Sequence, residues 1–332
     1  IDDTRRMGQA HLRLGIIFRQ TGEYDQAMEE FGQAMDLFET VHERAEIGRT
    51  LGAMGKLCEY RGDYDRAIDC YVQAFSLSED LRDSLGMAKT ANNMGIIYKN
   101  QGKYVDALRV YNESLSIIDP EKDPMQVADG YINMGNVFVY LGTYEQALEY
   151  FEMAREIAEK EGSAKSRALC LSNSGVVLNK LNSFQEAEKY YQRALEISTS
   201  IDDPAMISNC LINIGTNLSS MGNHELGLEY VERGQVIKVK LGDPKAISNC
   251  LIHKAEIYLK MEEYELASKL FAEAIPVKKE LGDVEALTRC YLGLAKISYA
   301  HHNYTSASNM SDRALAFASE INSLEHLTTV YG

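Results

Sequence analysis

The stretch IIYKNQGKYVDALRVY, residues 96–111, decides the fold of the chain. Apolar residues recur three and four positions apart on both sides of Gly102, as expected for two amphipathic helices joined by a short turn. Gly102 suits the end of the first helix, and Tyr104 is placed to pack between the two helices. The alternation of a β-strand is absent, so the stretch predicts a helix–turn–helix unit.

This unit recurs with a step of 40 residues. A small residue in the first helix marks each unit: Gly15, Gly55, Gly95, Gly135, Gly175, Gly215, Ala255 and Ala295. Nine positions later an aromatic ring follows in every unit but the sixth, which has His224, and three positions after that an alanine, replaced by Gly227 in the sixth. We expect units at about 8–47, 48–87, 88–127, 128–167, 168–207, 208–247, 248–287 and 288–327, with partial repeats at both ends.

The pattern resembles the tetratricopeptide repeat (TPR) family over essentially the whole chain. The resemblance implies an all-α, right-handed superhelical solenoid of about eight helix–turn–helix units, with residues 1–332 forming a single solenoid. The usual TPR period is about 34 residues. The six extra residues of each unit fall at junctions such as LGDP, which implies longer helices rather than another fold. Similar 40-residue units occur in kinesin light chain, in the polarity adaptor Pins and in many bacterial sensory proteins.

Composition narrows the classes of partner that the chain is expected to bind. The formal charge is −15, whereas nucleic acid partners demand a basic surface. No apolar run approaches the roughly 18 residues that a membrane helix needs. We therefore expect neither nucleic acid nor membrane as a partner.

Four of the six cysteines, Cys170, Cys210, Cys250 and Cys290, occupy one slot of successive units. Equivalent helices in neighbouring units should lie about 10 Å apart, too far for disulfides. We expect buried, reduced, structural cysteines, which suits the cytoplasm. The sequence also lacks HExxH, GxSxG and glycine-rich phosphate-loop motifs, so no catalytic residue, metal site, cofactor or enzyme activity is predicted.

The resemblance implies that the first helix of each unit lines an inner groove. Ten of the 17 asparagines fall at the 48 groove positions, far above the two or three expected by chance: Asn92, Asn93, Asn100, Asn133, Asn136, Asn173, Asn179, Asn209, Asn213 and Asn249. Helix propensity does not favour asparagine, but its amide offers the donor and acceptor that an extended peptide backbone requires. A ladder for peptide binding and a habit of the family both account for this excess.

Charge is also distributed unevenly. The groove positions hold ten basic residues, Arg13, Arg19, Arg49, Lys56, Lys89, Lys99, Lys180, Lys260, Arg289 and Lys296, against Glu59, Asp129 and Glu256. A basic groove on an acidic molecule should attract an acidic ligand. Tyrosines such as Tyr140 would offer an amphipathic contact surface beside these charges.

These features predict a scaffold that binds an extended, acidic peptide or a partner protein. The candidate site residues are Arg49, Lys56, Lys89, Asn92, Asn93, Lys99, Asn133, Asn136, Tyr140, Asn173, Asn179, Lys180, Asn213 and Asn249. The alternative is a sensory or regulatory region of a larger signalling protein, such as a histidine kinase, nucleotide cyclase or transcription regulator, whose effector domain lies outside this chain.

Two further expectations concern the ends and the sixth unit. The closing EHLTTVYG reads as the start of another first helix, so we expect the native protein to continue, and uncapped ends offer a route to homo-oligomers. Gly227 and Gly234 stand where other units carry alanine or serine, and should weaken the second helix of their unit by about 1 kcal/mol each.

Overall fold

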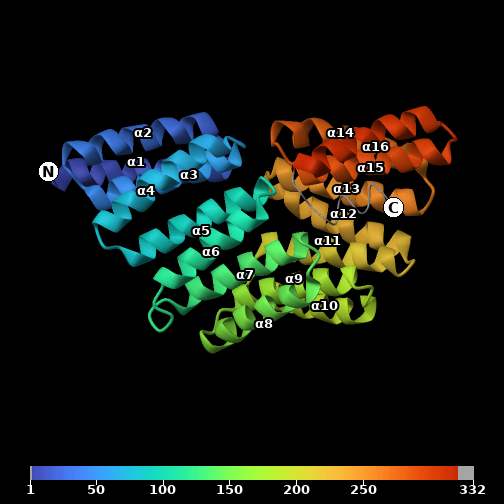
Figure 1. The fold of residues 1–332 in the computed structure, drawn as a ribbon, viewed down its shortest axis with the longest axis horizontal. Helices are drawn as coiled ribbons and strands as arrows, with labels where there is room; N and C mark the ends of the chain where they lie inside the picture. The colour runs from blue at the N-terminus through green and yellow to red at the C-terminus, as the bar shows by residue number, and fades with distance from the viewer. Residues whose placement is uncertain (1, 321–332) are drawn as a thin grey trace. The chain divides into compact units, whose positions relative to one another are not determined.

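The computed structural model describes residues 2–320, and within them the chain forms sixteen α-helices, α1 to α16 (Figure 1). They belong to two compact units, Ile1–Asn100 with Tyr104–Gly130, and Gln101–Lys103 with Tyr131–Gly332. The first unit holds α1 (Asp2–Thr21), α2 (Tyr24–Thr40), α3 (Arg44–Tyr60), α4 (Tyr64–Asp80), α5 (Ser84–Asn100) and α6 (Tyr104–Ile117). The division passes through α7 (Pro124–Tyr140).

The second unit continues the same alternation of helices. It holds α8 (Tyr144–Lys160), α9 (Ala164–Lys180), α10 (Phe184–Ser200), α11 (Pro204–Ser220), α12 (His224–Leu241), α13 (Pro244–Lys260), α14 (Tyr264–Glu280), α15 (Val284–Ala300) and α16 (Tyr304–Glu320). Each first helix packs on the second helix that follows it, as α3 on α4 and α11 on α12. The prediction of an all-α chain of about eight helix–turn–helix units is confirmed.

Local sequence sets where the helices begin and end. The side chain of Asp243 accepts a hydrogen bond from the backbone N–H of Ala246 at the start of α13, and Pro244 occupies the first turn. Gly102, between α5 and α6, has a φ of +72°, a conformation that glycine adopts without strain. The helix pairs begin about four residues earlier than the predicted units. The pair α3–α4, for example, begins at Arg44 rather than at residue 48.

In the first five helix pairs, the glycine of the first helix faces an aromatic ring of the second helix. A Cβ added to Gly175 would lie 2.6 Å from a ring carbon of Tyr191, which is almost fully buried. Phe31, Tyr71 and Phe151 fill the same place in other helix pairs. Burying each ring contributes about 1.5–3 kcal/mol, so glycine, by admitting the ring, adds to the core of its unit.

The cysteine slot behaves as predicted. Cys170, Cys210, Cys250 and Cys290 are buried and free of disulfides. Burial raises the pKa of Cys210 and Cys250, and that of Cys290 to about 12. These three thiols are therefore neutral packing groups at physiological pH.

The glycines of α12 have a packing role that the sequence analysis missed. The helix runs unbroken through Gly227 and Gly234. A Cβ on Gly227 would lie 2.6 Å from the backbone oxygen of Gly215, and one on Gly234 would lie 2.9 Å from that of Ser208. Their missing side chains let α12 approach α11 closely.

Two further observations concern the C-terminal residues and membrane-spanning helices. The closing segment EHLTTVYG, residues 325–332, lies outside the described residues, as does the end of the predicted last unit. No helix within residues 2–320 is long and apolar enough to span a membrane.

Candidate functional site: an asparagine-lined hollow

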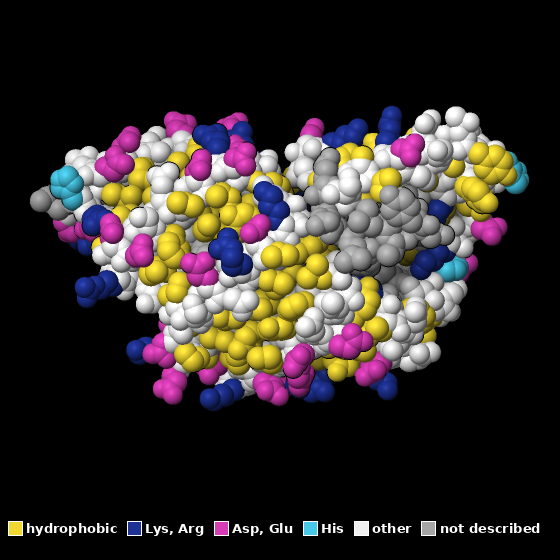
Figure 2. Space-filling view, in the orientation of Figure 1, with side chains coloured by type: hydrophobic (Ala, Val, Ile, Leu, Met, Phe, Trp, Pro, Cys, Tyr) yellow, Lys and Arg dark blue, Asp and Glu magenta, His cyan; other side chains and the backbone are white. Residues whose placement is uncertain are grey.

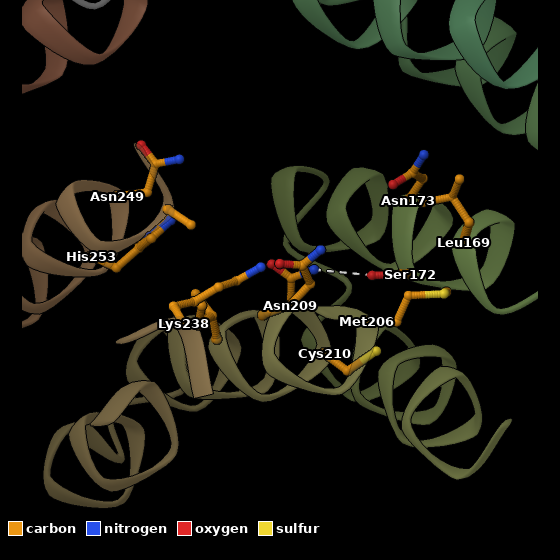
Figure 3. A pocket seen from close by; sticks show the side chains of 12 residues that line it. Leu169, Ser172, Asn173, Met206, Asn209, Cys210, Lys238, Asn249 and His253 are labelled. Carbon is orange, nitrogen blue, oxygen red and sulfur yellow. Dashed lines mark hydrogen bonds between the residues drawn. The ribbon is translucent and has the colours of Figure 1, made fainter. Parts of the chain in front are cut away.

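A hollow of about 200 Å³ opens between four helices of the second unit, α9, α11, α12 and α13 (Figure 3). Four asparagines line it, Asn173 from α9, Asn209 and Asn213 from α11, and Asn249 from α13. The first helices of three successive helix pairs therefore bring amide groups to one place.

Apolar and neutral groups complete the wall. Leu169 and Met206 are among the apolar residues of the wall, and Cys210 lies in it as a neutral thiol. Burial, together with the nearby charge of Arg289, lowers the pKa of His253 to about 4, so its imidazole is also neutral at physiological pH.

The asparagines keep hydrogen-bonding capacity for a ligand. Asn213 donates to the hydroxyl of Ser172 at 3.1 Å, and Asn173 donates to the amide oxygen of Asn136 at 3.1 Å. Asn249 accepts from the ammonium of Lys278. The exposed Asn209 makes no side-chain hydrogen bond to the described residues. An amide has two donors and an acceptor with two lone pairs, so each of these side chains retains unused groups.

Lys238 of α12 is the one lysine within residues 2–320 that lines the hollow, and it is only 7% exposed. Figure 3 shows its side chain pointing towards Asn209. Its ammonium reaches the backbone oxygen of Ala205 at 3.5 Å, the outer limit of a hydrogen bond. Burial lowers the pKa of Lys238, an effect that the charge of Asp243 opposes.

Two of the predicted basic residues of the first unit, Arg49 and Lys56, are paired with carboxylates. Arg49 lies 3.2 Å from the buried carboxylate of Glu46, and Lys56 lies 2.8 Å from that of Glu59. The ammonium of Lys56 also lies 5.7 Å from the ring centre of Tyr60. These cations are therefore less available to an acidic ligand than their number suggested.

The remaining first-unit candidates differ in exposure. Lys89 is exposed, Asn93 and Lys99 are half-buried, and Asn92 is buried at 9% exposure. A buried amide offers little to a ligand, so the geometry weakens the interpretation of Asn92 as a binding residue. On the face shown in Figure 2, acidic and basic side chains are interspersed.

Second-unit candidates fall into two groups. Asn173, Asn213 and Asn249 meet at the hollow. Asn179 instead donates at 2.8 Å to the amide oxygen of Asn217, which is fully buried. The other candidates, which do not line the hollow, are Asn133, Asn136, Tyr140 and Lys180.

Sequence reasoning missed Leu169, Met206 and Lys238 as residues of this hollow. One signal was available for the lysine. Six of the eight helix pairs carry an uncharged residue at the same slot, such as Ser198, so a charge there was unusual. Within residues 2–320, no cluster of three or more His, Cys, Asp or Glu side chains could hold a metal ion.

A family model, Tetratricopeptide repeat, matches residues 6–80, 62–119, 86–160, 126–200 and 165–235. The chain belongs to the tetratricopeptide repeat family. None of the curated proteins compared with this TPR chain matches it significantly.

Solved structures share the TPR fold. The Rap conjugation gene regulator of the plasmid pLS20, in complex with the Phr* peptide, has a TM-score of 0.71 at 15% identity, covering 99% of this chain and 98% of that one. Aspartyl phosphate phosphatase F from Bacillus subtilis has 0.64 at 18%, covering 88% and 74%. BtubC (BKLC) from P. vanneervenii has 0.52 at 21%, covering 68% and 92%.

Proposed function

We propose that this TPR chain is a scaffold that binds an extended peptide, or an extended segment of a partner protein, across the first helices of its second unit. The observation that carries the proposal is the convergence of Asn173, Asn209, Asn213 and Asn249 on one hollow. Amides with unused donors and acceptors suit a peptide backbone, which alternates N–H and C=O groups. The structure of the similar Rap regulator, solved with a peptide, supports the same mode of action.

The finer predictions about ligand, location and assembly remain proposals. The positive charge of the groove positions supports a preference for acidic peptides less than the sequence suggested, because Arg49 and Lys56 are paired with carboxylates. The sensory alternative, the cytoplasmic location, homo-oligomers through the ends and action by binding rather than catalysis stay predictions. One similar structure is that of a phosphatase, so action by binding rather than catalysis needs a phosphatase assay of its own.

The test uses the purified chain and a pool of random heptapeptides, with bound peptides identified by mass spectrometry. An enriched peptide is then titrated against the chain and against the double variant Asn209→Ala/Asn213→Ala. We expect at least about tenfold weaker binding, because two amide contacts are lost. The control is Asn112→Ala, which removes an exposed amide of α6 outside the hollow.

Two results would overturn the proposal. Failure to enrich any peptide would argue against a peptide-binding groove. Equal affinity of the double variant and the parent chain would move the interaction away from the hollow. Thermal unfolding of each variant shows whether a loss of binding reflects the hollow or a loss of fold.

A further inference from the structure

Two buried lysines, Lys238 of α12 and Lys278 of α14, occupy the same slot of successive helix pairs. The slot is uncharged in the other units: Phe38, Ser78, Ile118, Ala158, Ser198 and Ala318. A lysine ammonium is costly to bury, so each lysine calls for an explanation.

The burial of Lys278 is explained by a partner within the protein. It is fully buried, and its ammonium lies 2.8 Å from a carboxylate oxygen of Asp283 and also donates to Asn249. Burial by itself raises the pKa of Asp283, but the charge and hydrogen bond of Lys278 outweigh it and hold that pKa below its usual value. Lys278 is therefore part of an internal ion pair.

Lys238 lacks such a partner. The residue matching Asp283 is Asp243, yet no carboxylate within residues 2–320 forms an ion pair with the Lys238 ammonium. Its hydrogen bond, to the backbone of Ala205, is long at 3.5 Å. Three N–H donors are present, so most of the bonding capacity of this charge is unused.

The direction of the side chain shows where that capacity is available. Lys238 points into the asparagine-lined hollow, towards Asn209 (Figure 3). The other titratable groups of the wall, Cys210 and His253, are neutral at physiological pH. Among the described residues that line the hollow, Lys238 thus supplies the one charge, beside amides that can donate to an anion.

We propose that Lys238, with Asn209 and Asn213, forms a receptor for one carboxylate of the bound peptide. This inference rests on the proposed peptide-binding function and names the chemical group that the hollow selects. The carboxylate belongs to an Asp or Glu side chain or to the peptide C-terminus, which are chemically equivalent here. It provides the ion pair that Asp283 provides for Lys278, and the amides fill its remaining lone pairs.

The experiment offers the purified chain four equal pools of random heptapeptides. Two pools contain Asp and Glu, with a free or an amidated C-terminus, and two lack acidic residues, again free or amidated. We expect the amidated pool without acidic residues to be retained about tenfold or more weakly than the best pool, because it has no carboxylate. The stronger of the two single-carboxylate pools identifies the source of the group.

Variants of α11 and α12 test which residues produce the preference for peptides with a carboxylate. Lys238→Met should reduce the retention of every pool to that of the amidated pool without acidic residues. Lys240→Met, which removes an exposed lysine of the same helix, should leave the preference intact. A second variant, Asn209→Asp, supplies an internal carboxylate at the exposed rim of the hollow and should abolish the preference even if Lys238→Met does not fold.

The outcomes separate the two proposals. Retention of peptides without regard to carboxylates, or a preference that survives both Lys238→Met and Asn209→Asp, overturns the carboxylate receptor and leaves the peptide-binding scaffold standing. Retention of no pool by the parent chain overturns both.

Discussion

The helix pairs α11–α12 and α13–α14 share one architecture but differ in the residues where their helices meet. The first pair has Gly215 and Gly227 at positions where the second has Ala255 and Ala267. A Cβ on either glycine would meet the backbone oxygen of the other at 2.5–2.6 Å, so α12 lies closer to its partner than alanine would permit.

The same two pairs treat a buried lysine differently. Lys278 of α14 is joined to Asp283, whereas Lys238 of α12 points into a hollow with one long hydrogen bond. Asp243 and Asp283 each cap the helix that follows, but among the described residues the ion pair with a lysine is made by Asp283. The comparison teaches that a repeat can keep a residue and change its role, because the role depends on which partner is within reach.

Lys278→Met should have the largest effect on this comparison. The variant leaves the carboxylate of Asp283 without its cation, and we expect a loss of about 2–3 kcal/mol in the free energy of unfolding. The value lies at or below the low end for buried pairs because the side chain of Asp283 keeps 22% of its exposure. Urea denaturation followed by circular dichroism measures it. The double variant Lys278→Met/Asp283→Asn should recover about half, and an unchanged midpoint for the single variant would contradict the internal ion pair.

Gly227→Ala should come next, with a sign opposite to that of helix propensity. Alanine is favoured over glycine in a helix by about 1 kcal/mol, yet here its Cβ would lie 2.6 Å from the oxygen of Gly215. We expect a net loss of about 1–2 kcal/mol in unfolding free energy from overpacking. The control is Gly32→Ala in α2, where a Cβ has no neighbour within 4 Å and should stabilise the chain. Stabilisation by both variants would show that the close approach is not required.

Most of the fold could be predicted from the repeat, because the same pattern of residues recurs in successive helix pairs. Glycine against an aromatic ring, as in Gly175 and Tyr191, recurs at fixed spacing, and the spacing determines the packing. Unit boundaries were displaced by about four residues because the small residue marks the middle of a helix, whereas caps such as Asp243 mark its start.

The site was predictable only in part. The asparagine slot identified Asn173 and Asn213, since a first-helix position repeats along the chain. The groove positions did not indicate that Asn92 is buried or that Lys56 is paired with Glu59, because both depend on neighbours in other turns and helices. Lys238 was missed because it belongs to a second helix, which the groove assignment excluded.

Lys238→Met should change stability in the direction opposite to Lys278→Met. Removing a buried ammonium that lacks a counterion, while keeping a similar volume, should stabilise the peptide-free chain by about 1 kcal/mol. Urea denaturation of the two variants side by side gives both signs in one experiment. A loss of stability in Lys238→Met as large as that of Lys278→Met would show that Lys238 has an internal partner and would remove the contrast between the helix pairs.

The smallest expected effect is a pH dependence that belongs to Lys238. Burial holds its pKa in the folded chain below the ordinary value of 10.5, so between the two values the unfolded chain binds the proton more tightly than the folded one. Stability therefore rises as the pH increases through the folded pKa towards 10.5, and the advantage of Lys238→Met over the parent chain should shrink over that window. Urea denaturation at neutral pH and near pH 9.5 measures this difference, with Lys240→Met as the exposed control. A difference that stays constant, or that grows with pH, would mean that the Lys238 ammonium already has a counterion in the peptide-free chain, and the hollow would then have no unpaired charge to offer a carboxylate.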